Sequence, residues 1–190
     1  MYLHGGVIPA CGTFFVFSDY MKPAIRMAAL MRVPIKFVWS HDAFRVGEDG
    51  PTHEPVEQEA QIRLMEKLKN HKGQDSVRVF RPADADETTV CWQMANENMD
   101  TPTAMICSRQ NVNSLPEGTD YSQVRKGAYI VKDDPNYDVI LLASGSEVST
   151  LLAGAELLNA DGIKTRIVSV PSEGLFRTQS KAGSYTHLRA

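Results

Sequence analysis

The chain has 190 residues, of which 43% are hydrophobic and 23% are charged, and its formal net charge is -3. This composition is typical of a globular protein with room for one domain or two small ones, and it excludes a disordered chain. The negative charge offers no general attraction for nucleic acid, and no run of about 18 apolar residues is present to span a membrane, so we expect neither partner.

Strands and helices alternate along the first part of the chain. The spacing of apolar residues predicts strands at 7–10, 34–41, 76–80 and 103–107, and helices at 14–31, 56–68 and 84–98. Such β-α alternation is typical of a mostly parallel sheet with flanking helices. We therefore expect the α/β fold class.

A second strand-helix rhythm follows a polar, turn-rich stretch at 113–126. Apolar runs predict a strand at 138–143, a helix at 148–158 and a strand at 164–170. This βαβ unit is too small to bury a full core by itself. We expect the start of a second small α/β domain, joined to the first by a linker at 113–135.

The two ends and the cysteines give further expectations. Leu3-His4-Gly5-Gly6 resembles the end of a helix with its glycine stop, so we expect that the chain lacks its beginning. The spacing of the three cysteines fits neither a disulfide framework nor a zinc site, which favours a reducing cytoplasm. They are Cys11, Cys91 and Cys107.

Histidines and carboxylates are concentrated in the loop at 41–57, directly after a predicted buried strand. Open α/β sheets bind ligands where their strands end, and loops there carry chemistry. The candidate site residues are His41, Asp49 and His53. Their types permit structural hydrogen bonding, a metal site, or a site that handles the hydroxyls and protons of a polyol. The spacing follows no standard zinc pattern, which counts against a metal. We expect one or more of the loop's other acidic residues to be helix-capping or solvated charges; they are Glu48, Glu54 and Glu57.

Two further features are ambiguous from the residues alone. Phe14, Phe17 and Tyr20 recur every three residues, a spacing that usually indicates core packing on a helix. Arg109 follows the predicted strand at 103–107, where a structural salt bridge is the default interpretation. Neither feature identifies a ligand by its pattern.

Several segments resemble the transketolase family: His41-Asp42, the run from Gly47 to His53 (GEDGPTH), Pro55-Val56-Glu57-Gln58 and Ser108-Arg109-Gln110-Asn111. The flanking stretches at 14–30, 78–84 and 144–148 are also similar. The resemblance implies an N-terminally truncated pyrimidine-binding domain at 1–112 and the start of a C-terminal domain at 136–180. Residues 181–190 are not similar, and we interpret them as a possible cloning scar.

The resemblance also implies a cofactor, thiamine diphosphate. In transketolases, residues matching Phe14, Phe17 and Tyr20 form the slot for its aminopyrimidine ring. The Mg²⁺ ligands, the diphosphate site and the catalytic glutamate of the family would lie upstream of residue 1. We therefore place no metal ligand and no catalytic glutamate on this chain.

The substrate roles follow from the same resemblance. Residues matching His41, Asp49 and His53 line the sugar channel, and the two histidines also assist proton movement. The residue matching Arg109 binds the phosphate of sugar-phosphate substrates, for which a planar guanidinium is well suited.

The implied activity is transfer of a two-carbon ketol unit from a ketose phosphate to an aldose phosphate, in the pentose phosphate pathway, by a homodimeric enzyme. We expect this chain to be inactive alone. The alternatives are a related thiamine-dependent enzyme, such as dihydroxyacetone synthase or a deoxyxylulose-phosphate synthase, and a noncatalytic or split subunit.

Overall fold

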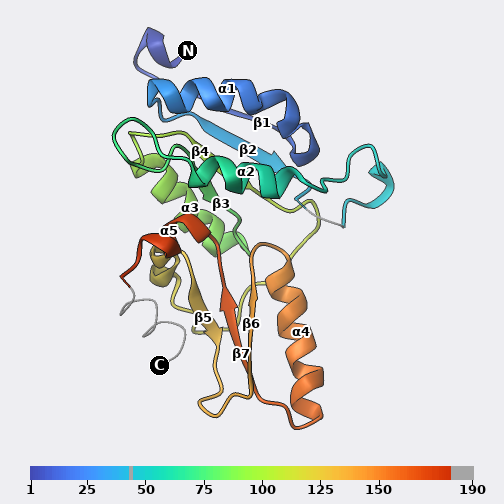
Figure 1. Ribbon diagram of the computed structural model, residues 1–190. Coiled ribbons are helices and arrows are strands. Elements are labelled where there is room, and N and C mark those ends of the chain that lie inside the picture. Colours follow the sequence, from blue (N-terminus) through green and yellow to red (C-terminus); the bar gives the residue numbers. More distant parts are fainter. Residues whose placement is uncertain (43–44, 181–190) are drawn as a thin grey trace. The chain divides into compact units, whose positions relative to one another are not determined.

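The computed structural model describes residues 1–42 and 45–180 (Figure 1). The chain divides into two compact units. The first contains residues 1–80 and 92–111, and the second contains residues 81–91 and the chain from residue 112 onward. The interpretation of the tail at 181–190 lies outside the described residues.

The first unit is built on a four-stranded parallel sheet with the order β1-β2-β4-β3. Its strands are β1 (Ala10–Phe14), β2 (Lys36–Ser40), β3 (Arg78–Phe80) and β4 (Thr103–Ile106). The helices are α1 (Ser18–Met31), α2 (Gln58–Lys67) and α3 (Ala85–Glu97), the last of which continues from the second unit into the first. The expected α/β class with a mostly parallel sheet is confirmed.

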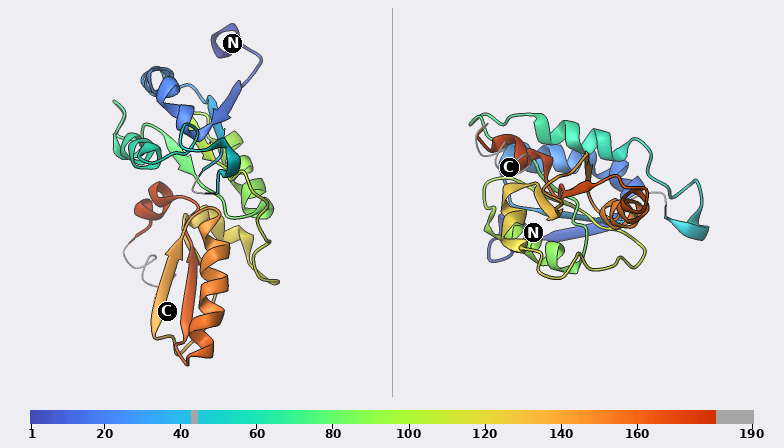
Figure 2. Two further views of the ribbon diagram at one scale, coloured as in Figure 1. Left: turned by 90° about the vertical axis from the view of Figure 1, so that its right-hand side faces the viewer. Right: turned by 90° about the horizontal axis from the view of Figure 1, so that it is seen from below.

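Helices cover both faces of this sheet, with α1 and α2 on one face and α3 on the other (Figures 1 and 2). On the α1–α2 face, Ile25 and Ile62 pack with alternate residues of the strands, such as Trp39 and Ile106, and all four are fully buried. The alternation follows from the two-residue period of a strand. Burial of such side chains supplies the main favourable free energy of the unit.

The start of the chain differs from the prediction. The strand expected at 7–10 lies at Ala10–Phe14, a 3₁₀ turn follows at Phe15–Phe17, and the helix begins only at Ser18. Residues 10–14 pair in parallel with residues 36–40 of β2, and this long-range pairing is not visible in local spacing. Phe14 and Phe17 therefore belong to a strand end and a turn, not to one helix face.

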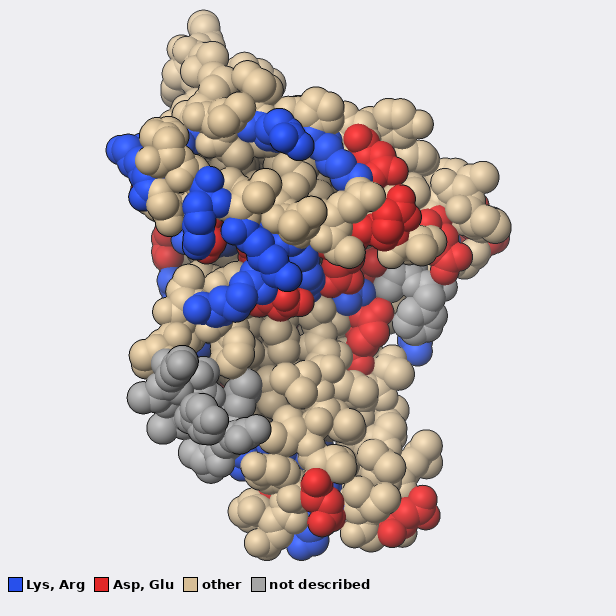
Figure 3. Space-filling model, in the orientation of Figure 1, with Lys and Arg blue, Asp and Glu red and all other residues tan. Residues whose placement is uncertain are grey.

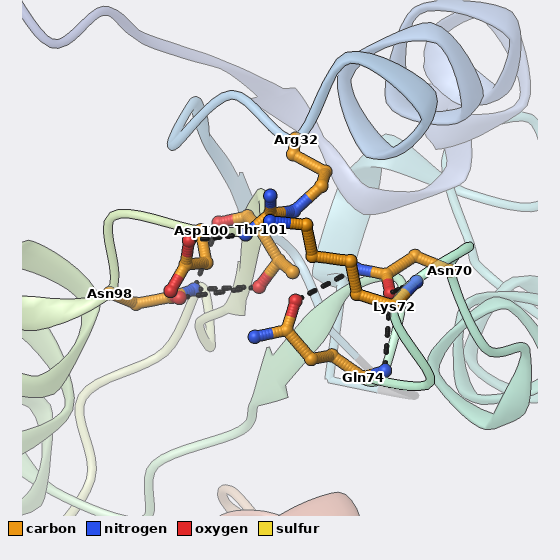
Figure 4. Close-up of polar contacts among 7 residues, drawn as sticks. All are labelled: Arg32, Asn70, Lys72, Gln74, Asn98, Asp100 and Thr101. Carbon is orange, nitrogen blue, oxygen red and sulfur yellow. Dashed lines mark hydrogen bonds and ion pairs between the residues drawn. The ribbon is translucent and has the colours of Figure 1, made fainter.

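The buried Lys36 of β2 holds the end of α3. Its side chain reaches the carbonyl oxygens of Ala95 and Asn98, and burial lowers the pKa of Lys36 to about 8. Figure 4 shows the adjoining loop, in which the Asn98 amide donates to Thr101. A cationic group at a helix C-terminus satisfies carbonyls that lack an intrahelical partner.

The loops beside this helix end have their own polar contacts, also visible in Figure 4. Arg32, in a left-handed conformation (φ 52°) after α1, pairs with Asp100. The Asn70 side chain accepts from the backbone N–H groups of Lys72 and Gln74, at 2.9 and 3.1 Å. These bonds close the turn between α2 and β3.

The second unit has a three-stranded sheet with the order β5-β7-β6. Its elements are β5 (Tyr129–Lys132), β6 (Val139–Ala143), α4 (Glu147–Ala160), β7 (Thr165–Ser169) and α5 (Glu173–Thr178). The predicted parallel pair appears as β6 and β7. A strand that was not predicted, β5, lies within the segment expected as a linker and pairs antiparallel with β7.

A buried carboxyl group joins parts of the second unit. Glu87 is fully buried and accepts hydrogen bonds from Tyr129 Oη at 2.7 Å, Ser169 Oγ at 2.5 Å and the Ala83 N–H at 2.7 Å. Burial raises the pKa of Glu87, whereas these three donors oppose the rise. Glu87 therefore anchors the first turn of α3 to β5 and β7.

Gly12 provides a test of the parallel pairing. A Cβ atom at Gly12 would lie 2.6 Å from the carbonyl oxygen of Val38 on β2, so Gly12→Ala must displace one strand. We expect a loss of about 1–3 kcal/mol in the free energy of unfolding. Trp39 and Trp92 both lie in the first unit, so urea denaturation followed by tryptophan fluorescence measures the effect.

The matched control is Gly154→Ala in α4, where an added Cβ meets nothing within 4 Å. Because glycine is unfavourable inside a helix, this variant should gain up to about 1 kcal/mol, measured by circular dichroism. A Gly12→Ala variant as stable as the original chain would contradict the close strand approach.

Candidate active site

The candidate residues gather at one edge of the first unit's sheet, where the strands end. Phe14 is the last residue of β1, His41 directly follows β2, and Arg109 lies three residues after β4. The register pairs Phe14 with Ser40 and places Trp39 opposite Ile106, so these strands end together. The parallel sheet thus brings together side chains that are far apart in the sequence.

Asp49 connects the two basic side chains of this edge. Its Oδ2 lies 3.2 Å from His41 Nε2 and 3.3 Å from Arg109 Nε. Arg109 Nη2 also lies 3.1 Å from Glu48 Oε1. The turn Gly47–Asp49 that carries both acidic residues starts at a glycine with φ 77°, and a Cβ there would lie 3.4 Å from the Arg109 guanidinium.

His41 is held in an unusual backbone conformation. Its φ is 62°, in the left-handed region that few residues other than glycine adopt. The Phe14 ring lies 3.9 Å from the imidazole between centroids, and Ser40 Oγ lies 2.9 Å from Nδ1. With Nε2 facing a carboxylate, a neutral imidazole carries its proton on Nε2 and accepts from Ser40 at Nδ1. Such strain at a site edge points to function.

His53 returns from the loop to lie against two aromatic rings. Its imidazole is 5.3 Å from the Phe17 ring at an interplanar angle of 78°, and 5.7 Å from the Phe14 ring at 58°. Thr52 Oγ1 lies 2.8 Å from His53 Nδ1. Edge-to-face contacts of this kind stabilise an aromatic pair by about 0.5–1.5 kcal/mol beyond burial.

Three rings form an aromatic surface beside the imidazoles, consisting of Phe14, Phe17 and Tyr20. The Phe14 and Phe17 rings are 6.2 Å apart and nearly parallel, with an interplanar angle of 22°. The Phe17 and Tyr20 rings are also 6.2 Å apart, and Tyr20 is 83% exposed. These rings are not a buried helix stripe, and they leave aromatic area free to contact a flat ligand.

The sequence reasoning missed one member of the site. Glu48 is a largely solvated charge, as expected, but it also contacts Arg109, which the sequence did not predict. Only the fold shows that the Glu48-Asp49 pair faces an arginine 60 residues later in the chain. Arg109 itself faces two carboxylates, as the ion-pair interpretation of an arginine after a strand anticipated.

The electrostatic setting of the site is acidic. Figure 3 shows aspartate and glutamate side chains gathered toward the loop end of the first unit, whereas lysine and arginine lie over α1 and α2. Arg109 is therefore a cation set among carboxylates. Among residues 1–42 and 45–180, no group of three or more His, Cys, Asp or Glu side chains is arranged to hold a metal ion.

Two family models match the chain. Residues 1–114 match "Transketolase, pyrimidine binding domain", and residues 127–189 match "Transketolase-like TK C-terminal domain". A transketolase of Halalkalibacterium halodurans is 48% identical over 183 residues, which cover 95% of this chain and 26% of that protein. The chain thus spans about a quarter of the length of the curated relatives it matches.

Solved structures agree with the sequence matches. Transketolase from Leishmania mexicana superposes with a TM-score of 0.86 at 38% identity, covering 98% of this chain and 26% of that one. A structure described as a split-gene transketolase, inactive beta4 tetramer, gives 0.63 at 25% identity, covering 88% of this chain and 50% of that one. In the described part of this chain, no helix has the length and apolar character to cross a membrane.

Cys107, directly after β4, gives a test of burial at this edge. Desolvation, with a smaller contribution from the nearby Asp42 carboxylate, raises the pKa of the Cys107 thiol to about 11. The thiolate is the reactive form, so at pH 8 iodoacetamide should modify Cys107 more than about a hundredfold more slowly than a free cysteine. Mass spectrometry of the Cys107 peptide measures this rate.

The exposed Cys11 is the internal comparison and should react faster than Cys107. Asp42→Asn should accelerate Cys107 by less than about tenfold, because burial and not charge is the larger cause. A Cys107 rate equal to that of a free cysteine would show that the end of β4 is open to solvent.

Proposed function

The chain belongs to the transketolase family, and we propose that it forms part of an enzyme that transfers a two-carbon ketol unit from a ketose phosphate to an aldose phosphate. One observation carries this proposal: His41, Asp49, His53 and Arg109 meet at a single sheet edge beside the aromatic surface. Imidazoles, a carboxylate and a guanidinium suit the hydroxyls and the phosphate of such a sugar.

The aromatic surface fits the flat ring of thiamine diphosphate. Phe17 and the exposed Tyr20 present ring area next to His53, and offset stacking of a planar heterocycle on such rings is favourable. When bound, the cofactor supplies the carbanion chemistry that cleaves and forms the carbon-carbon bond. This chain's residues supply the surface on which the pyrimidine ring is oriented.

Hydroxyl binding and proton transfer fall to the imidazoles and Asp49. His41 Nε2 lies 3.2 Å from Asp49 Oδ2, and a sugar hydroxyl can bind to either group. His53 has Nδ1 bonded to Thr52, which leaves Nε2 to exchange a proton with substrate. Imidazole suits this task because its ordinary pKa is near neutrality.

Phosphate binding is assigned to Arg109. A phosphate presents several anionic oxygens in the geometry that the guanidinium prefers, so it can compete with the carboxylates now in contact. Glu48 is the weaker competitor, because its side chain is 85% exposed and therefore solvated, whereas Asp49 is 29% exposed.

The remaining features of the parent enzyme are part of the same proposal. Mg²⁺ and the diphosphate group would bind to sequence that the relatives have outside the matched quarter. We further infer a homodimer that works in the cytoplasm on sugar phosphates of the pentose phosphate pathway. None of the three cysteines, all of which lie in the described part of the chain, is in a disulfide, and this is compatible with a reducing compartment.

A second candidate is a split subunit. Its support is the likeness to a split-gene transketolase chain, because this chain covers 50% of the length of that chain. It covers only about a quarter of the length of the other relatives. In that case the present chain would bind a separate chain that carries the diphosphate-binding part. Both candidates place the same residues at the sugar site.

A segment exchange tests the proposed function. Residues 1–180 would replace the matching segment of the Halalkalibacterium halodurans transketolase, which is 48% identical. With thiamine diphosphate, Mg²⁺, a pentulose phosphate donor and an aldopentose phosphate acceptor, we expect ketol transfer within about tenfold of that enzyme. A folded, dimeric chimera without transfer would reject the proposal.

Within this chimera, single substitutions test the roles. His53→Ala should lower kcat by about a hundredfold, as for loss of a general acid-base group. Arg109→Lys should raise KM for phosphorylated donors about tenfold with little change in kcat, because the bidentate fork is lost. The control is His71→Ala at an exposed turn, which should change neither constant.

The ion pair of Arg109 gives a prediction that needs no turnover. Glu48→Gln should tighten binding of inorganic phosphate to the chain by up to about fivefold, because one competing carboxylate is removed. NMR titration of the Arg109 Nε–H signal measures the dissociation constant. Glu54→Gln, which makes the same charge change in the same loop, is the control, and an equal effect there would refute specific competition.

A further inference from the structure

Gln58, the first residue of α2, joins two parts of the candidate site through a side chain that is only 3% exposed. Its Oε1 accepts a hydrogen bond from the Val56 N–H at 2.8 Å, and its Nε2 donates to Asp19 Oδ2 at 3.1 Å. Asp19 lies in the first turn of α1, two residues after Phe17. Val56 is the next-to-last residue of the loop that carries His53, which lies three residues earlier.

The two partners require an amide at this position. The Val56 N–H can only donate and the Asp19 carboxylate can only accept, so one end of the Gln58 amide must face each. A carboxylate here would satisfy Val56 but would place a like charge against Asp19. An apolar side chain of the same length would leave the bond to a charged group unmade.

Asp19 is itself fixed, which makes it a firm anchor. Lys22 bonds its other oxygen and also Gln61 of α2, and this contact with Lys22 is the main reason that the pKa of Asp19 is lowered. The Gln58 bond lowers it further. The start of α1 and the start of α2 are thus joined by two adjacent polar links.

The His53 side chain contacts Thr52, Phe14 and Phe17, but the backbone of its loop has little support. Its loop from Gly50 to Glu57 contains neither a helix nor a strand, and its backbone N–H bonds only within the loop, to Gly50 at 3.1 Å. The position of the imidazole against the Phe17 ring therefore depends on how the two ends of the loop are held. Gln58 holds the end at α2.

We propose that Gln58 is a positioning residue, which fixes the His53 imidazole against the aromatic surface by linking the end of the loop to Asp19. The geometric part of this statement stands on the described contacts alone. Its consequence for ketol transfer rests on the function proposed above. Gln58 touches neither a reacting atom nor a cofactor in this role.

The geometric part is tested on the 190-residue chain by NMR at constant pH. The original chain should give a nuclear Overhauser effect between the rings of His53 and Phe17, whose centroids are 5.3 Å apart. Gln58→Met and Gln58→Glu should both lose it. His53→Asn identifies the His53 signals, and circular dichroism shows whether each variant is folded.

Two further variants separate positioning from general damage. Gln61→Met makes the same change one turn along α2, where the partner is Lys22, and should keep the effect. The double variant Asp19→Asn with Gln58→Glu reverses the donor and the acceptor, and should restore the effect that Gln58→Glu loses. An effect that survives in folded Gln58→Met, or that the double variant fails to restore, would overturn the proposal.

The catalytic consequence is measured in the Halalkalibacterium chimera. Gln58→Met should lower kcat about tenfold while the KM for thiamine diphosphate changes less than about threefold, because Phe17 lies in the 3₁₀ turn before α1 and not in the loop that carries His53. A change in the cofactor KM alone would contradict the assigned role. If the unsubstituted chimera is inactive, the proposed function fails, whereas the NMR result still decides the positioning role.

Discussion

The common edge at which β1, β2 and β4 end is the constraint on which the candidate site depends. Because the three strands are parallel, their C-terminal ends lie at the same edge of the sheet. The residues at or just beyond these ends are Phe14, His41 and Arg109. A shift of the register by one residue would turn each strand's side chains to the opposite face. The fully buried Trp39 and Ile106, which are register partners, oppose such a shift because they would no longer share the face on which they pack with Ile25 and Ile62.

The chain must also turn sharply at this edge, and His41 is where it does so. A left-handed conformation is costly for histidine, and the contacts that offset the cost are the Phe14 ring and Ser40. The same contacts fix the direction of Nε2 toward Asp49. The backbone strain of His41 and the orientation of its side chain therefore both follow from its position at the end of β2.

Much of this arrangement could be predicted from the sequence, because it depends on local patterns. Buried strands followed by polar residues placed His41 and Arg109 at strand ends, and glycines and prolines marked the loop that follows His41. The roles of these residues stay predictions. What the sequence could not supply depends on pairing between distant segments: the strand at Ala10–Phe14, the antiparallel β5, and the contact of Glu48 with Arg109. Local spacing contains no information on such partners.

The side chains of the site become steadily more exposed from His41 to Glu48, so the site has a buried end and a solvent-exposed end. The exposed fraction of the side chain rises from 11% at His41 through 29% at Asp49 and 35% at Arg109 to 85% at Glu48. Charge interactions are stronger where water is excluded, so proton transfer is favoured at the His41 end and exchange of an anion at the Glu48 end. Under the proposed function, a sugar phosphate would hold its phosphate toward solvent on Arg109 and extend its other end toward the imidazoles and the aromatic surface. The reacting carbons would then lie where the environment is least polar, next to the rings that orient the cofactor.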